Sequence, residues 1–162
     1  MDWDKLAQRV HAQSVIAGNW SDWYPMTKRH ETGLMMAVCD ITKAQFVGNP
    51  EDISEMVRVF TTPLASAAYT LLDLAAIHEK IGLNAASAFV PHNMENLQRR
   101  EGMMARLGYV IWTMHQSAYP EINIRDGLCS IMALCELYNA PLVETLEEII
   151  EGREIGSQTA DT

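Results

Sequence analysis

Three cationic side chains are the candidates for holding a phosphate. Lys43 stands beside Asp40 at a spacing of three residues, whereas Arg99 and Arg100 are adjacent. A lysine is a compact point charge with three donors, so it can bind a phosphate directly, without a metal ion between them. The alternative for each of these residues is an ordinary solvated side chain on a helix surface.

Aromatic side chains gather in the segment 19–28, which contains Trp20, Trp23 and Tyr24 and is too irregular for a helix. Aromatic rings stack on nucleobases with about 1–3 kcal/mol per base and little preference among bases. The segment is therefore a candidate contact for a base. The alternative is a hydrophobic staple between the helices on either side.

The known catalytic and metal-binding motifs are missing from the sequence. No histidine belongs to an H-E-x-x-H motif, none is followed by aspartate, and there is no glycine-rich phosphate loop or Ser/His/Asp order. Four C-terminal glutamates have helical spacing, but they share one helix with no facing acids, so we expect a solvated face: Glu144, Glu147, Glu148 and Glu151. We predict no catalytic residue and no metal ligand.

The composition is that of one folded domain. The chain has 162 residues, of which 48% are hydrophobic and 20% charged. A net charge of -9 with only 12 Lys and Arg argues against general nucleic-acid binding, which depends on phosphate neutralisation. No apolar run approaches the length that crosses a bilayer, and no signal peptide is visible, so we expect a cytoplasmic protein. Cys39, Cys129 and Cys135 form no C-x-x-C pair, and we expect reduced, buried thiols.

Apolar spacing predicts a chain that is helical almost throughout. Asp2 is a suitable cap for the first helix, Gly18 a suitable stop, and Pro63 a suitable first residue for a new helix. The predicted helices are 3–17, 32–47, a short one at 53–60, 63–81, 100–116, and two more between 124 and 149. Residues 152–162 lack apolar periodicity, and we expect a disordered tail.

The second half of the chain repeats features of the first. Residues 100–105 echo 30–37, and residues 124–149 parallel 63–89. One interpretation is an internal tandem duplication, and the other is two generic pairs of amphipathic helices. We predict one helical domain over 1–151, with a first unit at about 3–98 and a partial second unit at 99–151. The predicted core residues are Val38, Ile41, Leu71, Leu72, Leu107, Ile111, Ile131 and Leu134.

Four segments occur in a familiar order: LAQRVHAQSVIAGNW (6–20), HETGLMMAVCDITKAQ (30–45), LLDLAAIHEKIGLN (71–84) and NLQRR (96–100). This order resembles the MazG-like branch of the all-α nucleoside-triphosphate pyrophosphatases. The resemblance implies an all-α helical bundle, a nucleotide ligand and, with the duplication, a pseudo-dimer within one chain. It also implies base or phosphate contacts from Asn96 and Arg99, although Pro91 interrupts that segment.

The magnesium-binding acids of that family are largely replaced here. Asp40 and Lys43 stand at the first acidic pair, and Pro63 and Ser66 at the second. In the partial second unit the same positions hold Tyr109, Trp112, Asn123 and Asp126. The resemblance therefore implies that the helical scaffold of the family is retained while its metal site is degenerate. We expect no cofactor, and Mg²⁺ would be required only if the protein is an active enzyme.

Three functions are compatible with these observations. The first is a nucleotide-binding protein that sequesters a nucleotide or cyclic (oligo)nucleotide without hydrolysis, as sponge-like phage proteins do against immune signals. The second is an active nucleoside-triphosphate pyrophosphohydrolase with an unconventional set of acids. The third is a protein-interaction bundle, since 10 methionines offer adaptable apolar contacts. We predict no membrane partner, and a homo-oligomer stays open.

Overall fold

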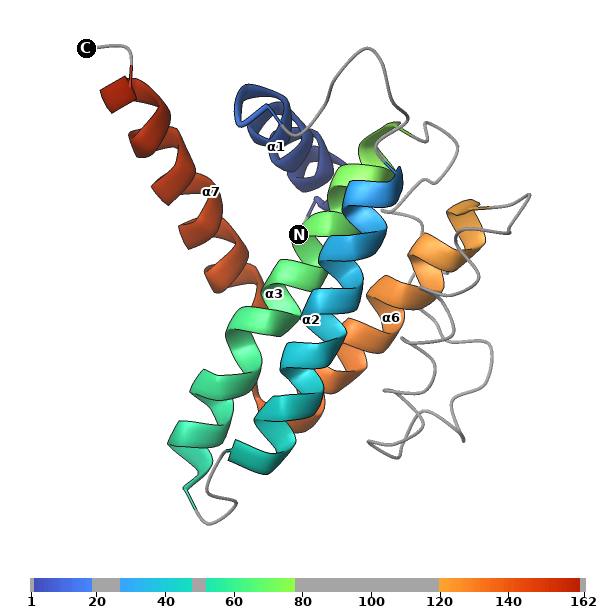
Figure 1. Ribbon diagram of the computed structural model, residues 1–162, viewed down its shortest axis with the longest axis vertical. Helices are drawn as coiled ribbons and strands as arrows, with labels where there is room; N and C mark the ends of the chain where they lie inside the picture. The colour runs from blue at the N-terminus through green and yellow to red at the C-terminus, as the bar shows by residue number, and fades with distance from the viewer. Residues whose placement is uncertain (1, 19–26, 48–51, 78–119, 161–162) are drawn as a thin grey trace.

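The computed structural model describes residues 2–18, 27–47, 52–77 and 120–160, which form α-helices and no strand (Figure 1). The helices are α1 (Trp3–Ile16), α2 (Thr27–Val47), α3 (Ile53–Ile77), α6 (Pro120–Tyr138) and α7 (Leu142–Ala160). The predicted all-α class is confirmed for this part of the chain. The predicted helix at 100–116 lies outside the described residues, and the duplication that depends on it stays a prediction.

Helix α3 is the centre of the bundle. It contacts α1, α2, α6 and α7, and α2 lies alongside it as the other arm of a hairpin (Figure 1). Apolar residues surround α3 on most of its circumference, which is the pattern of a helix buried among others. Phe60, Leu64, Leu71 and Leu72 are each 0% exposed.

The expectation that no apolar run reaches a membrane-spanning length needs correction. The window Val59–Ala76 in α3 is long and apolar enough by length and composition, with a mean hydropathy of 1.2. In the structure 67% of that window is buried inside the bundle. A core helix has the same composition, and its neighbours here account for the apolar surface.

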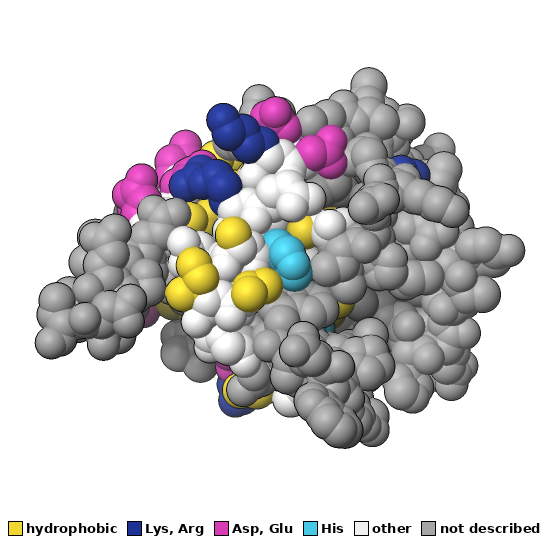
Figure 2. Space-filling view, turned by 90° about the horizontal axis from the view of Figure 1, so that it is seen from above, with side chains coloured by type: hydrophobic (Ala, Val, Ile, Leu, Met, Phe, Trp, Pro, Cys, Tyr) yellow, Lys and Arg dark blue, Asp and Glu magenta, His cyan; other side chains and the backbone are white. Residues whose placement is uncertain are grey.

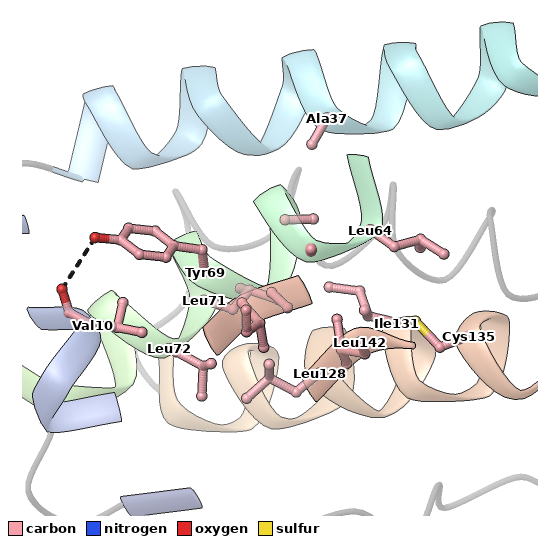
Figure 3. Close-up of a cluster of buried hydrophobic side chains, with 14 of the residues drawn as sticks. Val10, Ala37, Leu64, Tyr69, Leu71, Leu72, Leu128, Ile131, Cys135 and Leu142 are labelled. Atoms are coloured by element: carbon pink, nitrogen blue, oxygen red, sulfur yellow. Dashed lines mark hydrogen bonds between the residues drawn. The ribbon is translucent and has the colours of Figure 1, made fainter. Parts of the chain in front are cut away.

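The core collects side chains from all the described helices (Figure 3). Of the predicted core residues, Ile41, Leu71, Leu72, Ile131 and Leu134 are buried and Val38 packs against them. Leu107 and Ile111 lie outside the described residues.

Burial also raises the pKa of the Cys135 thiol to about 12. Cys39, in contrast, is exposed, so the expectation of three buried thiols was wrong.

Local signals set the ends of α1 as predicted. The Asp2 side chain accepts a hydrogen bond of 3.0 Å from the Lys5 N–H, as an N-cap does. At the other end Gly18 has a φ of 71°, and its N–H donates to the Val15 carbonyl at 3.0 Å. Glycine adopts this left-handed conformation without a steric penalty.

The largest difference from prediction concerns Pro63, which begins no new helix. It lies inside α3, which runs unbroken from Ile53 to Ile77. A proline inside a helix costs about 3 kcal/mol or more. Its neighbours Phe60 and Leu64 are fully buried, each contributing roughly 1.5–3 kcal/mol, so tertiary burial outweighs the penalty.

Two further helix ends differ from the sequence prediction. Helix α2 begins at Thr27 rather than at residue 32. Helix α7 continues to Ala160, although we expected disorder from Gly152 onward. An exposed glycine costs only about 1 kcal/mol relative to alanine, which is too little to end a helix anchored by the buried Leu146 and Ile150.

The core predicts a large contrast between two single substitutions. Leu72→Ala removes a side chain that is 0% exposed and should lower the free energy of unfolding by about 2–5 kcal/mol. Ile16→Ala, at a position that is 62% exposed, should change it by less than about 0.5 kcal/mol. Urea titrations followed by circular dichroism measure both values. Equal losses in the two variants would contradict the central place of α3.

Candidate functional site

A cavity of about 530 Å³ lies between α2 and α3. Volumes of this size are typical of small-ligand sites. Its described lining comes from the facing sides of the two helices: Gly33, Met36, Ala37, Asp40, Lys43, Val59, Thr62, Pro63 and Ser66. We call this cavity the α2–α3 groove.

The α2–α3 groove brings together four positions that the resemblance to the MazG-like family had singled out. Asp40 and Lys43 line it from α2, and Pro63 and Ser66 line it from α3. Residues three apart in a helix point to the same side, so each pair lies on one side of its helix, at the groove. The groove therefore sits where the resemblance would place metal and phosphate, with different side chains.

Lys43 is only weakly engaged within the described structure. Its Nζ lies 4.0 Å from Asp40 Oδ1, and the two side chains are 75% and 60% exposed. Exposed pairs of this kind contribute little, because water and salt screen them and both side chains lose freedom. The ammonium group can therefore turn toward an anion at little cost.

The rest of the groove is lined mainly by apolar residues, several of which have small side chains. Met36, Ala37, Val59 and Pro63 supply carbon surface, while Gly33 supplies open space. A Cβ built on Gly33 would meet only Thr70 Oγ1, at 3.8 Å. Because Pro63 has no N–H, the Val59 carbonyl lacks its usual helical donor.

The remaining predicted site residues cannot be assigned to the groove. They lie outside the described residues: Trp20, Trp23, Tyr24, Asn96, Arg99 and Arg100. Asp126 lies on α6, half-buried, and does not line the groove. The MazG-like resemblance also stays a prediction, since the chain matches no family model, no curated protein and no solved structure.

A second polar cluster lies inside the bundle around Asp73, which is 1% exposed. Its Oδ1 is 2.8 Å from His11 Nδ1, and its Oδ2 is 2.8 Å from His30 Nε2. The Ser14 hydroxyl also donates to Oδ2. Side chains of α1 and α2 thus converge on a single carboxylate of α3, and we call these four residues the Asp73 cluster.

Hydrogen bonding keeps the Asp73 carboxylate charged. Burial alone disfavours the charged form, but hydrogen bonds from His30, Ser14 and His11, together with the electrostatic attraction of His30, outweigh it and lower the pKa of Asp73. An ionised carboxylate only accepts, so His11 donates through Nδ1 and His30 through Nε2.

Figure 2 shows a histidine reaching the surface among apolar side chains. Of the two imidazoles, His11 is the more exposed, at 26% against 6%.

Sequence reasoning missed the Asp73 cluster, because it tested the histidines only as metal ligands and catalysts. Two signals could have found it. Asp73 interrupts the apolar run LLDLAA, and a charge at such a position must be paired if it is buried. His11 and Ser14 share one side of α1 at a spacing of three. In the part of the chain that the structure describes, no three His, Cys, Asp or Glu side chains are arranged to hold a metal ion.

The Asp73 cluster predicts that Asp73→Asn lowers the free energy of unfolding by a large amount that depends on pH. The substitution removes the charge and turns an amide N–H toward groups that donate, so the free energy of unfolding near pH 7 should fall by about 3–5 kcal/mol. Asp40→Asn, at a 60% exposed side chain, is the matched control and should change it by less than about 0.5 kcal/mol.

The sign of the pH effect follows from the lowered pKa of Asp73. The contribution of Asp73 is fully present above the pKa of an unfolded aspartate, about 3.9, and is lost as the pH falls through the lower folded value. The difference in stability between the parent and Asp73→Asn should therefore shrink below about pH 4. Urea titrations from pH 7 to pH 2 measure it, and a difference that stays constant would contradict an ionised Asp73.

Proposed function

We propose that this protein binds a nucleotide in the α2–α3 groove and holds it without hydrolysis. The observation that carries the proposal is the shared location of Asp40, Lys43, Pro63 and Ser66 in one cavity of ligand size. These are the positions that meet metal and phosphate in the family that the sequence resembles. A sequestering role follows from binding without turnover.

Lys43 is the proposed phosphate ligand. Its weak contact with Asp40 leaves three N–H donors for phosphate oxygens. Thr62 and Ser66 line the same groove from α3, and their hydroxyl groups can add neutral hydrogen bonds. A charge-assisted hydrogen bond contributes roughly 1.5–3 kcal/mol, which is enough to anchor the anionic end of a ligand.

The composition of the groove supports binding rather than hydrolysis. Two-metal hydrolysis needs carboxylates that converge from facing helices. Among the described lining residues Asp40 is the single carboxylate, and the facing positions of α3 hold Pro63 and Ser66. A lysine at position 43 also places a positive charge where a metal ion would bind.

A protein-interaction surface is the second candidate, and a specific observation favours it. Met35 and Met36 are 60% and 63% exposed on α2, and Val15 and Ile16 are 48% and 62% exposed on α1. Methionine side chains are flexible and polarisable, so they suit adaptable apolar contacts. Met36 belongs to both interpretations because it also lines the groove.

Two matched glycine substitutions test the location of the site. Gly33→Leu places a side chain in the groove, whereas Gly152→Leu places the same side chain on α7 with nothing within 4 Å of its Cβ. Both should fold, since leucine is the better helix former by roughly 0.5–1 kcal/mol. Calorimetric titration with nucleotides and cyclic nucleotides, with and without Mg²⁺, should show at least roughly tenfold weaker binding for Gly33→Leu only.

Two results would overturn this proposal in different ways. If Gly33→Leu binds as tightly as Gly152→Leu, the site lies elsewhere. If the parent protein binds no nucleotide, the protein-interaction candidate takes first place. Recovery of the bound ligand unchanged, by chromatography after denaturation, supports sequestration.

The hydrolytic alternative is tested separately. We expect no release of pyrophosphate from the common nucleoside triphosphates with Mg²⁺ or Mn²⁺, because the described groove offers too few carboxylates. A coupled pyrophosphate assay measures this. Turnover that Asp40→Ala or Asp126→Ala abolishes would show that the remaining acids suffice for catalysis.

A further inference from the structure

Three sulfur-bearing side chains share one exposed face of α2. Met35, Met36 and Cys39 are all exposed, whereas their neighbours Leu34 and Ala37 are buried in the core. Apolar residues that are scattered singly over a surface need no explanation. Here, in contrast, three side chains lie within little more than one turn of a helix, and each carries a polarisable sulfur atom. We call these three residues the α2 sulfur triad.

Helix geometry directs the three sulfur atoms toward one point. Successive residues of a helix are rotated by about 100°, so Cys39 lies between Met35 and Met36 around the helix axis, about 40° from the first and about 60° from the second. Residues three or four apart have Cβ atoms about 5–6 Å from each other. Side chains also lean toward the N-terminus of a helix, so Cys39 leans over the turn that carries both methionines. The flexible methionine side chains can then close around one small ion.

The chemistry of these ligands selects a soft ion. Thiolate and thioether groups suit Cu⁺, whereas Zn²⁺ takes cysteine, histidine and carboxylate ligands, and Mg²⁺ takes oxygen ligands. Over the described helices no group of three His, Cys, Asp or Glu side chains could hold a metal ion, so Cys39 has no set of zinc ligands there. The predicted absence of metal ligands was argued from histidines and carboxylates, and methionines were not considered as ligands.

We infer that the α2 sulfur triad binds one Cu⁺ ion through the Cys39 thiolate and the thioethers of Met35 and Met36. The thiol proton leaves to solvent when the ion binds, and no group is oxidised or reduced. Cys39 is not among the described lining residues of the α2–α3 groove, so this site is separate from the proposed nucleotide site and shares only Met36 with it. Cys129 and Cys135 are buried, and burial raises the pKa of the Cys135 thiol to about 12, which disfavours a competing thiolate.

The experiment measures Cu⁺ binding to the full, reduced chain without oxygen. Bathocuproine disulfonate competes for the ion, and the colour of its complex reports the ion that the protein does not hold. We expect one ion per chain. Combining Met35→Leu with Met36→Leu removes two of the three ligands but keeps apolar side chains that favour a helix, so binding should weaken at least about tenfold. Cys39→Ser should weaken it further. Met132→Leu, at a partly buried methionine of α6, is the control and should bind as the parent does.

Three results would overturn this inference. If the double leucine variant binds Cu⁺ as tightly as the parent, the thioethers are not ligands and the thiol alone holds the ion. If Cys39→Ser binds as tightly as the parent, the site lies elsewhere. If one ion binds per two chains and size-exclusion chromatography shows a dimer only with the ion, the ion bridges two copies instead.

Zn²⁺ is the control ion, because thioethers are not among its ligands. Any weak binding of Zn²⁺ to Cys39 should be the same in the parent and in the double leucine variant. An equal loss for Zn²⁺ and Cu⁺ would trace the effect to a disturbed helix and would contradict ligation by Met35 and Met36.

Discussion

A carboxylate that is 1% exposed can persist in an apolar bundle only if other groups replace the water it has lost. Asp73 meets this requirement with three donors from two other helices: His11 and Ser14 on α1, and His30 on α2. Hydrogen bonds have strict limits on distance and angle, unlike apolar contacts. The Asp73 cluster therefore fixes how α1 and α2 lie against α3, and a shifted packing would leave a buried charge without partners.

The α2–α3 groove depends on the same arrangement. His30 precedes Gly33 by one helical turn, and Asp73 follows Ser66 by two, so their hydrogen bond joins the two walls beyond the end of the groove that Gly33 and Ser66 line. The hydrogen bond between His30 and Asp73 limits the separation of the two walls there, because a longer distance would weaken this bond to a buried charge. On the other side of α1, Arg9 pairs with Glu147 of α7 at 2.7 Å. This pair is partly exposed, so it adds orientation more than stability.

Local features of the fold could be predicted from the sequence. The all-α class, the Asp2 cap, the Gly18 stop and most of the core follow from composition, capping chemistry and apolar spacing. Pro63 was misread because its local preference for a helix start is outweighed by the burial of its neighbours. The resemblance singled out Lys43 from the sequence. The volume and apolar lining of the cavity beside it depend on how two helices pack, which the sequence alone does not give.

Long-range pairing explains why the Asp73 cluster could not be predicted. Its hydrogen bonds join residues 43, 59 and 62 positions apart in the chain. Periodicity shows which side of a helix is apolar, but it does not show which polar groups meet across helices. A buried aspartate signals that partners exist, and only the packing identifies them.

Pro63 has a consequence for the motions of α3. The helix has no amide hydrogen at this position, so its ladder of hydrogen bonds is interrupted between Ile53 and Ile77. Proteins open locally in contiguous units, and the parts of an element with fewer buried contacts open at lower free energy. The first turns of α3, before the buried Phe60, can therefore fray while the segment that carries Asp73 stays closed. Amide exchange along α3 would then divide near the proline, with faster exchange in these first turns than in the core segment that follows.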